Sequence, residues 1–226
     1  NNMLRGRFIV IDGTDGSGKK TQVDLLAARV REEGRTVHVA DFPQYGKPSA
    51  YFVERYLNGA YGTLDTIDGY RGSLFFAMDR YDASFELRKM MDTGAIIVSN
   101  RYVSANMGHQ GAMIADTAER KKYLDWLYHL EFEILGIPKP DLTIILHVSA
   151  LVGQELVDHK GHREYVGGRK RDLLESDLDH LKAAEQTYLE IARFPKFKLI
   201  ECMKSGSIMT REDIHELIWR EVVAVL

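Results

Sequence analysis

The chain has 226 residues, 45% of them hydrophobic, which is ample for a sizeable core, so we predict a single domain over residues 1–226. The formal net charge of −3 gives no general basic field, which argues against nucleic acid as the main partner while leaving a local basic patch open. The lone Cys202 excludes an internal disulfide framework, and no apolar run approaches the ~20 residues that cross a bilayer, so we expect a cytoplasmic protein without a membrane role.

Short apolar runs alternate with segments of helical character along almost the whole sequence. In chain order, the pattern predicts a strand at 8–11, a helix at 19–33, a strand at 36–40, a helix ending at 57, a break at 58–62, a helix at 70–91, a strand at 95–98, a helix at 118–135, a strand at 142–148, a helix at 173–193, a strand at 197–202 and a helix from 211 onward. This alternation predicts an α/β fold with a doubly wound, mostly parallel five-stranded sheet flanked by helices. Ligands are expected at the carboxyl ends of its strands.

The glycine-rich segment after the first predicted strand matches the phosphate-binding pattern G-x-x-x-x-G-K and opens a helix. Its glycines let backbone N–H groups converge on phosphate oxygens, the helix N-terminus adds positive potential, and Lys19 can reach the β- and γ-phosphates. The predicted nucleotide-binding residues are Gly13, Asp15, Gly16, Ser17, Gly18, Lys19, Lys20 and Thr21. The alternative is a glycine-rich turn that carries a surface lysine.

One position departs from the phosphate-binding pattern. The residue after Lys19 should be a serine or threonine whose hydroxyl binds Mg²⁺, yet it is Lys20, and the next hydroxyl is on Thr21. Either the metal is held by other groups or the lysine charge partly replaces it. The sequence therefore predicts ATP and Mg²⁺ as cofactors and leaves the metal ligands open.

A phosphate-binding loop alone does not distinguish kinases from GTPases, motors and other ATPases. The chain has no N-K-x-D motif for reading guanine, and a helicase or transporter core would usually come with further domains. The rest of the chain must therefore indicate which reaction uses the bound nucleotide.

Two segments indicate an acceptor site for a small phosphorylated nucleoside. Phe76 and Arg80 are four residues apart on a predicted helix, so they share one face and could meet one base. Arg101 follows the third predicted strand and therefore lies at the carboxyl edge of the sheet. An arginine there can bind an acceptor phosphate through two hydrogen bonds. A core phenylalanine beside a surface arginine, and an arginine paired with a structural carboxylate, are the alternatives.

Basic residues and glycines crowd the polar stretch at about 158–172. The basic residues are Lys160, Arg163, Arg169, Lys170 and Arg171. Such a loop could close over the triphosphate as a lid, neutralise the transferred charge and exclude water. A solvated basic loop is the alternative, and a nucleic-acid patch is disfavoured at this net charge.

Taken together, these segments resemble the thymidylate kinase family of P-loop nucleoside monophosphate kinases, in the same order along nearly the whole chain. The matching pieces are 11–19 with Thr21 and Gln22, Phe42-Pro43, 74–80, 100–102, Gln110-Gly111, 139–142 and the basic loop before 172–175. The resemblance implies transfer of the γ-phosphoryl group of ATP to thymidylate (dTMP), which gives dTDP for dTTP synthesis. It also implies a homodimer, to which a helix near 74–90 could contribute.

The resemblance assigns roles to individual residues. Phe76 would stack on thymine, Arg80 would help to hold the base, Asp15 would touch the deoxyribose 3′-hydroxyl, and Gln110 and His109 would lie near the base and sugar. The substrate-binding residues expected in this way are Asp15, Phe42, Phe76, Arg80, Arg101 and Gln110. The catalytic cations expected are Lys19, Arg101, Arg169 and Arg171.

Three residues depart from the family pattern. Lys20 replaces the metal-binding hydroxyl, Asn100 stands where the family usually has Asp before Arg, and Asp41 stands where many members have Arg. The first two changes could be coupled, a cation gained and an anion lost beside Mg²⁺, which predicts a weaker Mg²⁺ dependence. The alternatives to a thymidylate kinase are a kinase for another deoxynucleotide or a free deoxynucleoside, and a non-catalytic nucleotide-binding protein.

Overall fold

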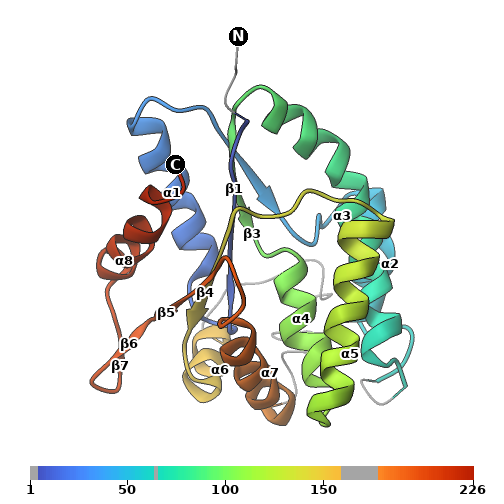
Figure 1. Ribbon diagram of the computed structural model, residues 1–226. Helices are drawn as coiled ribbons and strands as arrows, with labels where there is room; N and C mark the ends of the chain where they lie inside the picture. Colours follow the sequence, from blue (N-terminus) through green and yellow to red (C-terminus); the bar gives the residue numbers. More distant parts are fainter. Residues whose placement is uncertain (1–4, 64–65, 159–177) are drawn as a thin grey trace.

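The computed structural model contains a five-stranded parallel sheet in the order β2-β3-β1-β4-β5 (Figure 1). It describes residues 5–63, 66–158 and 178–226. The strands are β1 (Phe8–Gly13), β2 (Val37–Asp41), β3 (Ile96–Asn100), β4 (Leu142–His147) and β5 (Phe197–Glu201). The three central strands are buried almost throughout, as their continuous apolar runs require. The predicted α/β fold and its five strands are confirmed.

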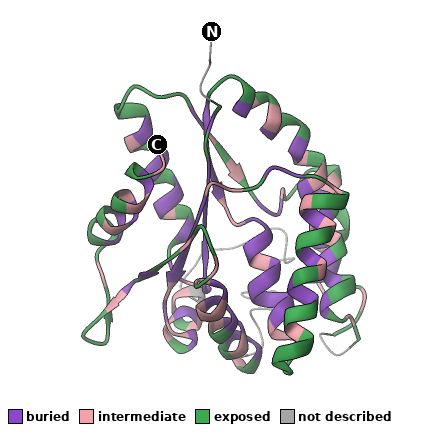
Figure 2. Ribbon diagram, viewed as in Figure 1, coloured by how far each residue is buried: buried purple, intermediate pink, exposed green. Residues whose placement is uncertain are grey.

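Helices cover both faces of the sheet. One face carries α1 (Lys19–Glu32) and α8 (Arg211–Val223), and the other carries α3 (Gly69–Asp92), α4 (Val103–Ala112), α5 (Thr117–Tyr128) and α7 (Leu178–Ile191) (Figure 1). Side chains alternate along β1, so Ile9 and Ile11 pack with α1 and α8, whereas Phe8 and Val10 pack with the other group. Figure 2 shows the buried residues concentrated along the strands and on the inward faces of the helices.

The remaining elements are short. They are η1 (Pro48–Ala50), α2 (Tyr51–Leu57), the π-helix η2 (His129–Ile134), α6 (Ala150–Asp158), and a small antiparallel hairpin of β6 (Met203–Lys204) and β7 (Ser207–Ile208). Because η2 continues α5, the predicted helix at 118–135 is two helical segments. The predicted helix at 173–193 corresponds to α7 within the described residues, and the predicted lid lies almost wholly outside them. No described helix is long and apolar enough to cross a membrane.

The helices α4 and α6 were not predicted. In α4, small and polar residues such as Ser104, Asn106 and Gly108 interrupt any apolar stripe, yet nearly the whole helix is buried. Gly108 permits this burial because a Cβ there would lie 2.5 Å from the ring of Tyr188 in α7. Tertiary packing, rather than local periodicity, therefore places α4 between the sheet and its neighbouring helices.

Helix starts differ between the structural helices and the one that follows the phosphate-binding loop. Asp68, Asp116 and Thr210 each accept a hydrogen bond from a backbone N–H in the first turn of α3, α5 and α8. The N-cap of α1 is Gly18, with φ of 82° and no side-chain cap. The N-terminus of α1 is therefore left available for a bound anion.

Candidate functional site

The phosphate-binding loop (residues 13–18) leaves β1 and is packed so closely that only glycine fits at two positions. Gly13 has φ of 135°, and a Cβ there would lie 2.0 Å from the carbonyl oxygen of Leu146. Gly16 has φ of 77°, and a Cβ there would lie 2.4 Å from the carbonyl oxygen of Gly153. The loop is thus held against β4 and α6.

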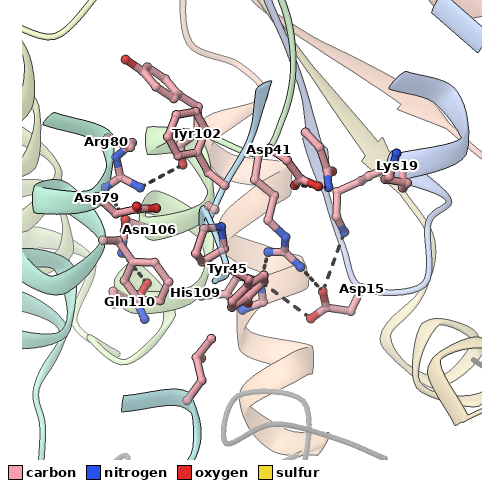
Figure 3. Close-up of a pocket in the computed structure, with 18 of the residues that line it drawn as sticks. Asp15, Lys19, Asp41, Tyr45, Asp79, Arg80, Tyr102, Asn106, His109 and Gln110 are labelled. Carbon is pink, nitrogen blue, oxygen red and sulfur yellow. Dashed lines mark hydrogen bonds and ion pairs between the residues drawn. The ribbon is translucent and has the colours of Figure 1, made fainter. Parts of the chain in front are cut away.

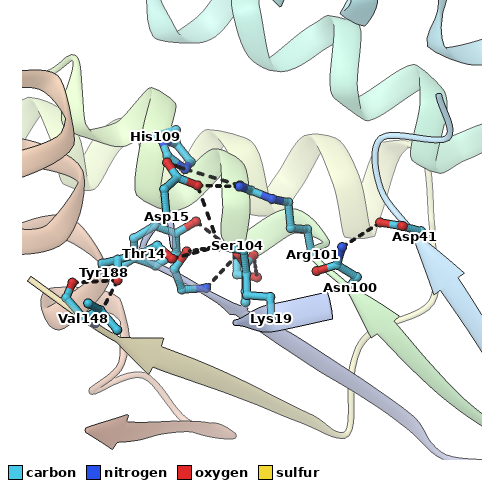
Figure 4. Close-up of polar contacts among 12 residues, drawn as sticks. Thr14, Asp15, Lys19, Asp41, Asn100, Arg101, Ser104, His109, Val148 and Tyr188 are labelled. Atoms are coloured by element: carbon cyan, nitrogen blue, oxygen red, sulfur yellow. Dashed lines mark hydrogen bonds and ion pairs between the residues drawn. The ribbon is translucent and has the colours of Figure 1, made fainter. Parts of the chain in front are cut away.

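The side chain of Lys19 folds back onto this loop. Its Nζ donates to the carbonyl oxygens of Gly13 at 3.1 Å and Thr14 at 2.8 Å, and lies 3.7 Å from Oδ1 of Asp15 (Figure 4). The hydroxyl of Ser17 is buried and has no hydrogen-bond partner in the described part of the chain. A buried donor without a partner costs free energy, so the loop is suited to receive an acceptor such as a phosphate oxygen.

Asp12, near the end of β1, connects the loop to two helices. Its Oδ1 accepts hydrogen bonds from the Gly13 N–H at 2.8 Å and the Tyr188 hydroxyl at 3.1 Å. Its Oδ2 accepts from the Ser104 hydroxyl at 2.6 Å. One fully buried carboxylate therefore fixes the start of the loop against both α4 and α7, a role that the phosphate-binding pattern from Gly13 onward does not predict.

Arg101 follows β3 with a backbone conformation that is uncommon for an arginine. Its φ is 63°, and the conformation is held by hydrogen bonds from its N–H to the Ile11 carbonyl at 2.9 Å and from the Ser99 hydroxyl to its own carbonyl at 2.7 Å. The guanidinium reaches the phosphate-binding loop, where Nη2 donates to Oδ1 of Asp15 at 2.7 Å (Figure 4). Such an uncommon backbone conformation persists only where the surrounding structure holds it, and residues of this kind cluster in active and ligand-binding sites.

Asp15, Arg101 and His109 form a buried cluster. Nε2 of His109 lies 3.3 Å from Nη1 of Arg101 and 3.7 Å from Oδ2 of Asp15. Burial opposes the charge of Asp15, but His109, Arg101 and Lys19 hold the pKa of its carboxyl far below the ordinary value. Burial, helped by Arg101 and opposed by Asp15, lowers the pKa of His109 to about 3. At neutral pH His109 is therefore uncharged, and Arg101 and Lys19 are the cations that keep Asp15 ionised.

A second buried ion pair lies farther from the loop. Arg80 donates to the carboxylate of Glu131. It also donates to Oδ1 of Asn106, and its Nη1 lies 3.4 Å from the Tyr102 carbonyl oxygen (Figure 3). Asn106 in turn donates to Oε1 of Gln110 at 2.8 Å. Arg80 is thus not the surface arginine of the alternative interpretation, because Glu131 from η2 pairs with it in the interior.

One cavity of about 260 Å³ extends from Asp15 and Arg101 to Arg80 (Figure 3). All the expected substrate-binding residues line it, namely Asp15, Phe42, Phe76, Arg80, Arg101 and Gln110. Of the other nucleotide-binding candidates, those that line it are Gly16, Gly18, Lys19, Lys20 and Thr21. Gly13 and Ser17 belong to the same loop but do not line the cavity, and Arg169 and Arg171 lie outside the described residues.

Several polar residues of the cavity were not predicted, among them Tyr45, Asp79 and Asn106. Asp79 accepts hydrogen bonds from the Gln44 N–H at 2.8 Å and the Ser49 hydroxyl at 2.6 Å, so it holds the loop that follows β2 and carries Tyr45. Asn106 precedes Gln110 by one helical turn. That spacing could have revealed it, had α4 been recognised as a helix.

The three residues that depart from the family pattern line the same cavity. Asn100 and Asp41 are register partners at the ends of β3 and β2, and Nδ2 of Asn100 donates to Oδ1 of Asp41 at 2.8 Å (Figure 4). Nζ of Lys20 pairs with Asp24 at 2.9 Å, and both of those side chains are largely exposed. Desolvation raises the pKa of Asp41, an effect that Asn100 and Lys20 oppose.

Fold and site together define the class of protein. A phosphate-binding loop after the first strand, an arginine after a neighbouring strand and a cavity that joins them are the features of a P-loop protein that binds a nucleotide and a second small ligand. The family model for thymidylate kinase matches residues 11–214, and the chain belongs to the thymidylate kinase family.

Relatives with the same family name span most of the chain. The thymidylate kinase of Mycobacterium tuberculosis is 32% identical over 186 residues, which cover 82% of this chain and 85% of the relative. A probable thymidylate kinase of Thermococcus onnurineus is 31% identical over 223 residues, with 92% and 93% coverage. A solved structure of thymidylate kinase from Candida albicans shares the fold, with a TM-score of 0.73 at 21% identity over 97% of this chain and 92% of that one.

Proposed function

We propose that the protein transfers the γ-phosphoryl group of ATP to the 5′-phosphate of dTMP, giving ADP and dTDP for dTTP synthesis. Membership of the thymidylate kinase family supports this reaction. The observation that carries it is the position of Arg101, which contacts Asp15 in the phosphate-binding loop and lines the cavity that reaches Arg80. An acceptor phosphate bound by Arg101 would lie next to the donor phosphates, as in-line transfer requires.

Phosphoryl transfer depends on alignment and charge stabilisation more than on covalent chemistry. Lys19 would exchange the carbonyl oxygens of Gly13 and Thr14 for the β- and γ-phosphates, and Arg101 would bind the acceptor phosphate. No general base is needed, because the phosphate of dTMP is already an anion at neutral pH. We propose Arg169 and Arg171 as further cations for the transferred group.

The nucleoside part of dTMP would occupy the end of the cavity near Arg80. Phe76 offers an aromatic face to the thymine ring, and Phe42 lines the same space. Arg80 and Gln110 would bind the base, and Asp15 the sugar hydroxyl. The buried hydrogen bonds of Arg80 fix its orientation before the base arrives, which reduces the entropy lost on binding.

We propose that ATP binds together with Mg²⁺. No group of three or more His, Cys, Asp or Glu that could hold a metal is present in the described part of the chain, which fits a cation held mainly by nucleotide phosphates and water. Thr21 and Asp41 line the cavity, and Oδ1 of Asn100 is buried without a hydrogen-bond partner among the described residues. When bound, Mg²⁺ would neutralise charge on the transferred phosphates.

We further propose that the enzyme is a homodimer and acts in the cytoplasm. The dimer is supported by exposed apolar residues on α3, since Leu74, Met78 and Phe85 are 44%, 53% and 51% exposed and their spacing places them on one helix face. The cytoplasmic location is supported by Cys202, which is a free and buried cysteine.

The test is ADP formation from ATP and Mg²⁺ with dTMP, dUMP, other monophosphates and free thymidine compared in parallel. We expect the fastest turnover with dTMP and none with thymidine. Turnover of thymidine would indicate a nucleoside kinase, and a different preferred monophosphate would indicate another nucleotide kinase. ATP binding without transfer to any acceptor would indicate a non-catalytic nucleotide-binding protein.

A further inference from the structure

The carboxylates that line the cavity differ in what already neutralises them. Asp15 is paired with Arg101 at 2.7 Å and lies 3.7 Å from Lys19. Asp79 has no ion pair among the described residues, but both of its carboxylate oxygens accept hydrogen bonds from the loop after β2. Asp41 lines the same cavity, has no ion pair in the described part of the chain and accepts a hydrogen bond there only at Oδ1. Asp41 is therefore the lining carboxylate whose charge remains available to a bound cation.

Asn100 holds this carboxylate in place and adds a second oxygen beside it. The amide Nδ2 of Asn100 donates to Oδ1 of Asp41 at 2.8 Å, across the ends of two paired strands. Oδ1 of Asn100 is buried and has no hydrogen-bond partner among the described residues. An unsatisfied buried oxygen costs free energy, and a water molecule on a nearby cation is a donor that would satisfy it.

The side chain of Asp41 is at an exposed position, so a hydrated cation can reach it. Lys20 is the nearest candidate to substitute for a metal, but its Nζ pairs with Asp24 at 2.9 Å on the surface.

We propose that Asp41 holds the hydrated divalent cation of the bound nucleotide, with Asn100 as its positioning residue; this inference rests on the proposed kinase function. In the family pattern the acid stands at position 100, after the third strand. Here the acid is Asp41, at the end of the adjacent strand β2. Relative to the family pattern, the negative charge is therefore present on the neighbouring strand. This differs from the hypothesis in which Lys20 replaces the metal and weakens the Mg²⁺ dependence.

Calorimetric titration of the full chain with ADP, once with Mg²⁺ and once with EDTA, gives the factor by which the metal strengthens ADP binding. Asp41→Asn should reduce this factor about tenfold, because partners in the outer shell of a metal contribute about 10–100-fold to its affinity. Metal-free ADP should bind this variant equally well or more tightly, since an anion near the phosphates has been removed.

A second variant keeps the test independent of damage to the fold. Asp41→Asn combined with Asn100→Asp returns the acid to β3 and should regain most of the metal enhancement. Asp92→Asn changes an exposed carboxylate just before the loop that leads into β3, at the opposite edge of the sheet, and should leave the factor unchanged.

Two results would overturn the inference: an unchanged factor in Asp41→Asn, which includes an equal weakening of ADP binding with and without Mg²⁺, or an equal fall in Asp92→Asn. The first would favour Lys20 as the substitute for the metal. Failure of the unaltered protein to bind ADP at all would instead overturn the proposed function, so the two failures are distinguishable.

Discussion

Arg101 combines a left-handed backbone with a partly buried guanidinium, and its neighbours fix both. Lysine would keep the charge at this position but could not contact Asp15 and an acceptor phosphate through one planar fork. We expect Arg101→Lys to lower kcat/KM for dTMP by on the order of a hundredfold, about 3 kcal/mol of transition-state stabilisation.

Steady-state kinetics with dTMP varied at saturating ATP measures this change. Arg31→Lys, at an exposed position in the last turn of α1, is the control and should behave as the unaltered protein. Full activity in Arg101→Lys would show that Arg101 acts only as a structural partner of Asp15.

The buried His109 makes stability depend on pH in a predictable direction. Its pKa is about 3 in the folded state against 6.5 in the unfolded chain, so its contribution is present above pH 6.5 and lost as pH falls toward 3. Between about pH 7 and pH 5 only the unfolded chain takes up this proton, which costs about 2 kcal/mol of stability. We expect His109→Gln to remove this part of the pH dependence.

Chemical denaturation of both proteins at pH 7 and at pH 5 measures the effect. The quantity compared is the change in the free energy of unfolding between pH 7 and pH 5 in each protein. Every other titrating group is common to both proteins, so the difference between the two changes reports His109. Parallel loss of stability in the two proteins would mean that His109 becomes protonated within the fold.

At the scale of elements, α4 depends on a close approach to α7. A Cβ on Gly108 would lie 2.5 Å from the Tyr188 ring, whereas a Cβ on Gly111 would meet Thr187 at an ordinary 3.4 Å. We expect Gly108→Ala to cost about 2 kcal/mol through overpacking and to lower Tm by several degrees. Gly111→Ala, on the same helix, should be neutral or slightly stabilising. Scanning calorimetry compares them, and equal Tm values would contradict this account of the packing.

His147 joins three elements at the end of β4. Its Nε2 lies 2.8 Å from Glu185 of α7 and its Nδ1 lies 2.6 Å from Glu201 of β5, while Glu185 also accepts from the Ala150 N–H of α6 at 2.9 Å. Burial opposes protonation, but the two glutamates raise the pKa of His147 above its ordinary 6.5. Its stabilising contribution is therefore complete below pH 6.5 and lost as pH rises through the raised pKa.

We expect His147→Gln to lower the free energy of unfolding by about 1 kcal/mol at about pH 6 and to have a smaller effect near pH 9. Urea denaturation at the two pH values measures this difference. An effect that grows with pH would mean that the neutral imidazole, rather than the imidazolium, makes the bridge.

The elements that could be predicted from sequence are those whose local pattern matches their environment. Strands buried on both faces read as continuous apolar runs, and β1, β3 and β4 follow that rule. The rule fails for α4, because a helix buried on nearly all sides needs small and polar residues where neighbouring helices and a ligand approach. Residues 173–177 of the predicted helix and nearly all of the predicted lid lie outside the described residues and stay predictions.

For the whole molecule, the exposed face of α3 leads to a prediction about assembly. Met78 is 53% exposed between the similarly exposed Leu74 and Phe85. If this face forms the homodimer interface, Met78→Glu places an unpaired charge in that interface and should yield monomers. Light scattering measures the mass. Ile134→Glu, at a 64% exposed position on η2, is the control and should leave the mass unchanged. A monomeric unaltered protein would contradict the proposed dimer.

The site as a whole could be predicted as far as its residues follow strands or share a helix face. Arg101 and the phosphate-binding loop met these conditions because parallel strands direct their carboxyl ends to one edge. Glu131 and Asp12 did not, since each acts through partners far away in sequence. Glu131 reaches Arg80 across 51 positions and Asp12 reaches Tyr188 across 176, and no local pattern reports such distances.

The hydrogen bonds of Asp12 bear on the order in which the protein matures. The phosphate-binding loop leaves the ribosome well before α7, whose Tyr188 donates a hydrogen bond to the buried Asp12 carboxylate. Until α7 has emerged and docked, Asp12 lacks that partner, and the loop rests on a sheet that still lacks β5. We therefore expect the full capacity to bind nucleotide only after α7 has been synthesised, because a nascent chain that ends before α7 carries the complete motif without these supports.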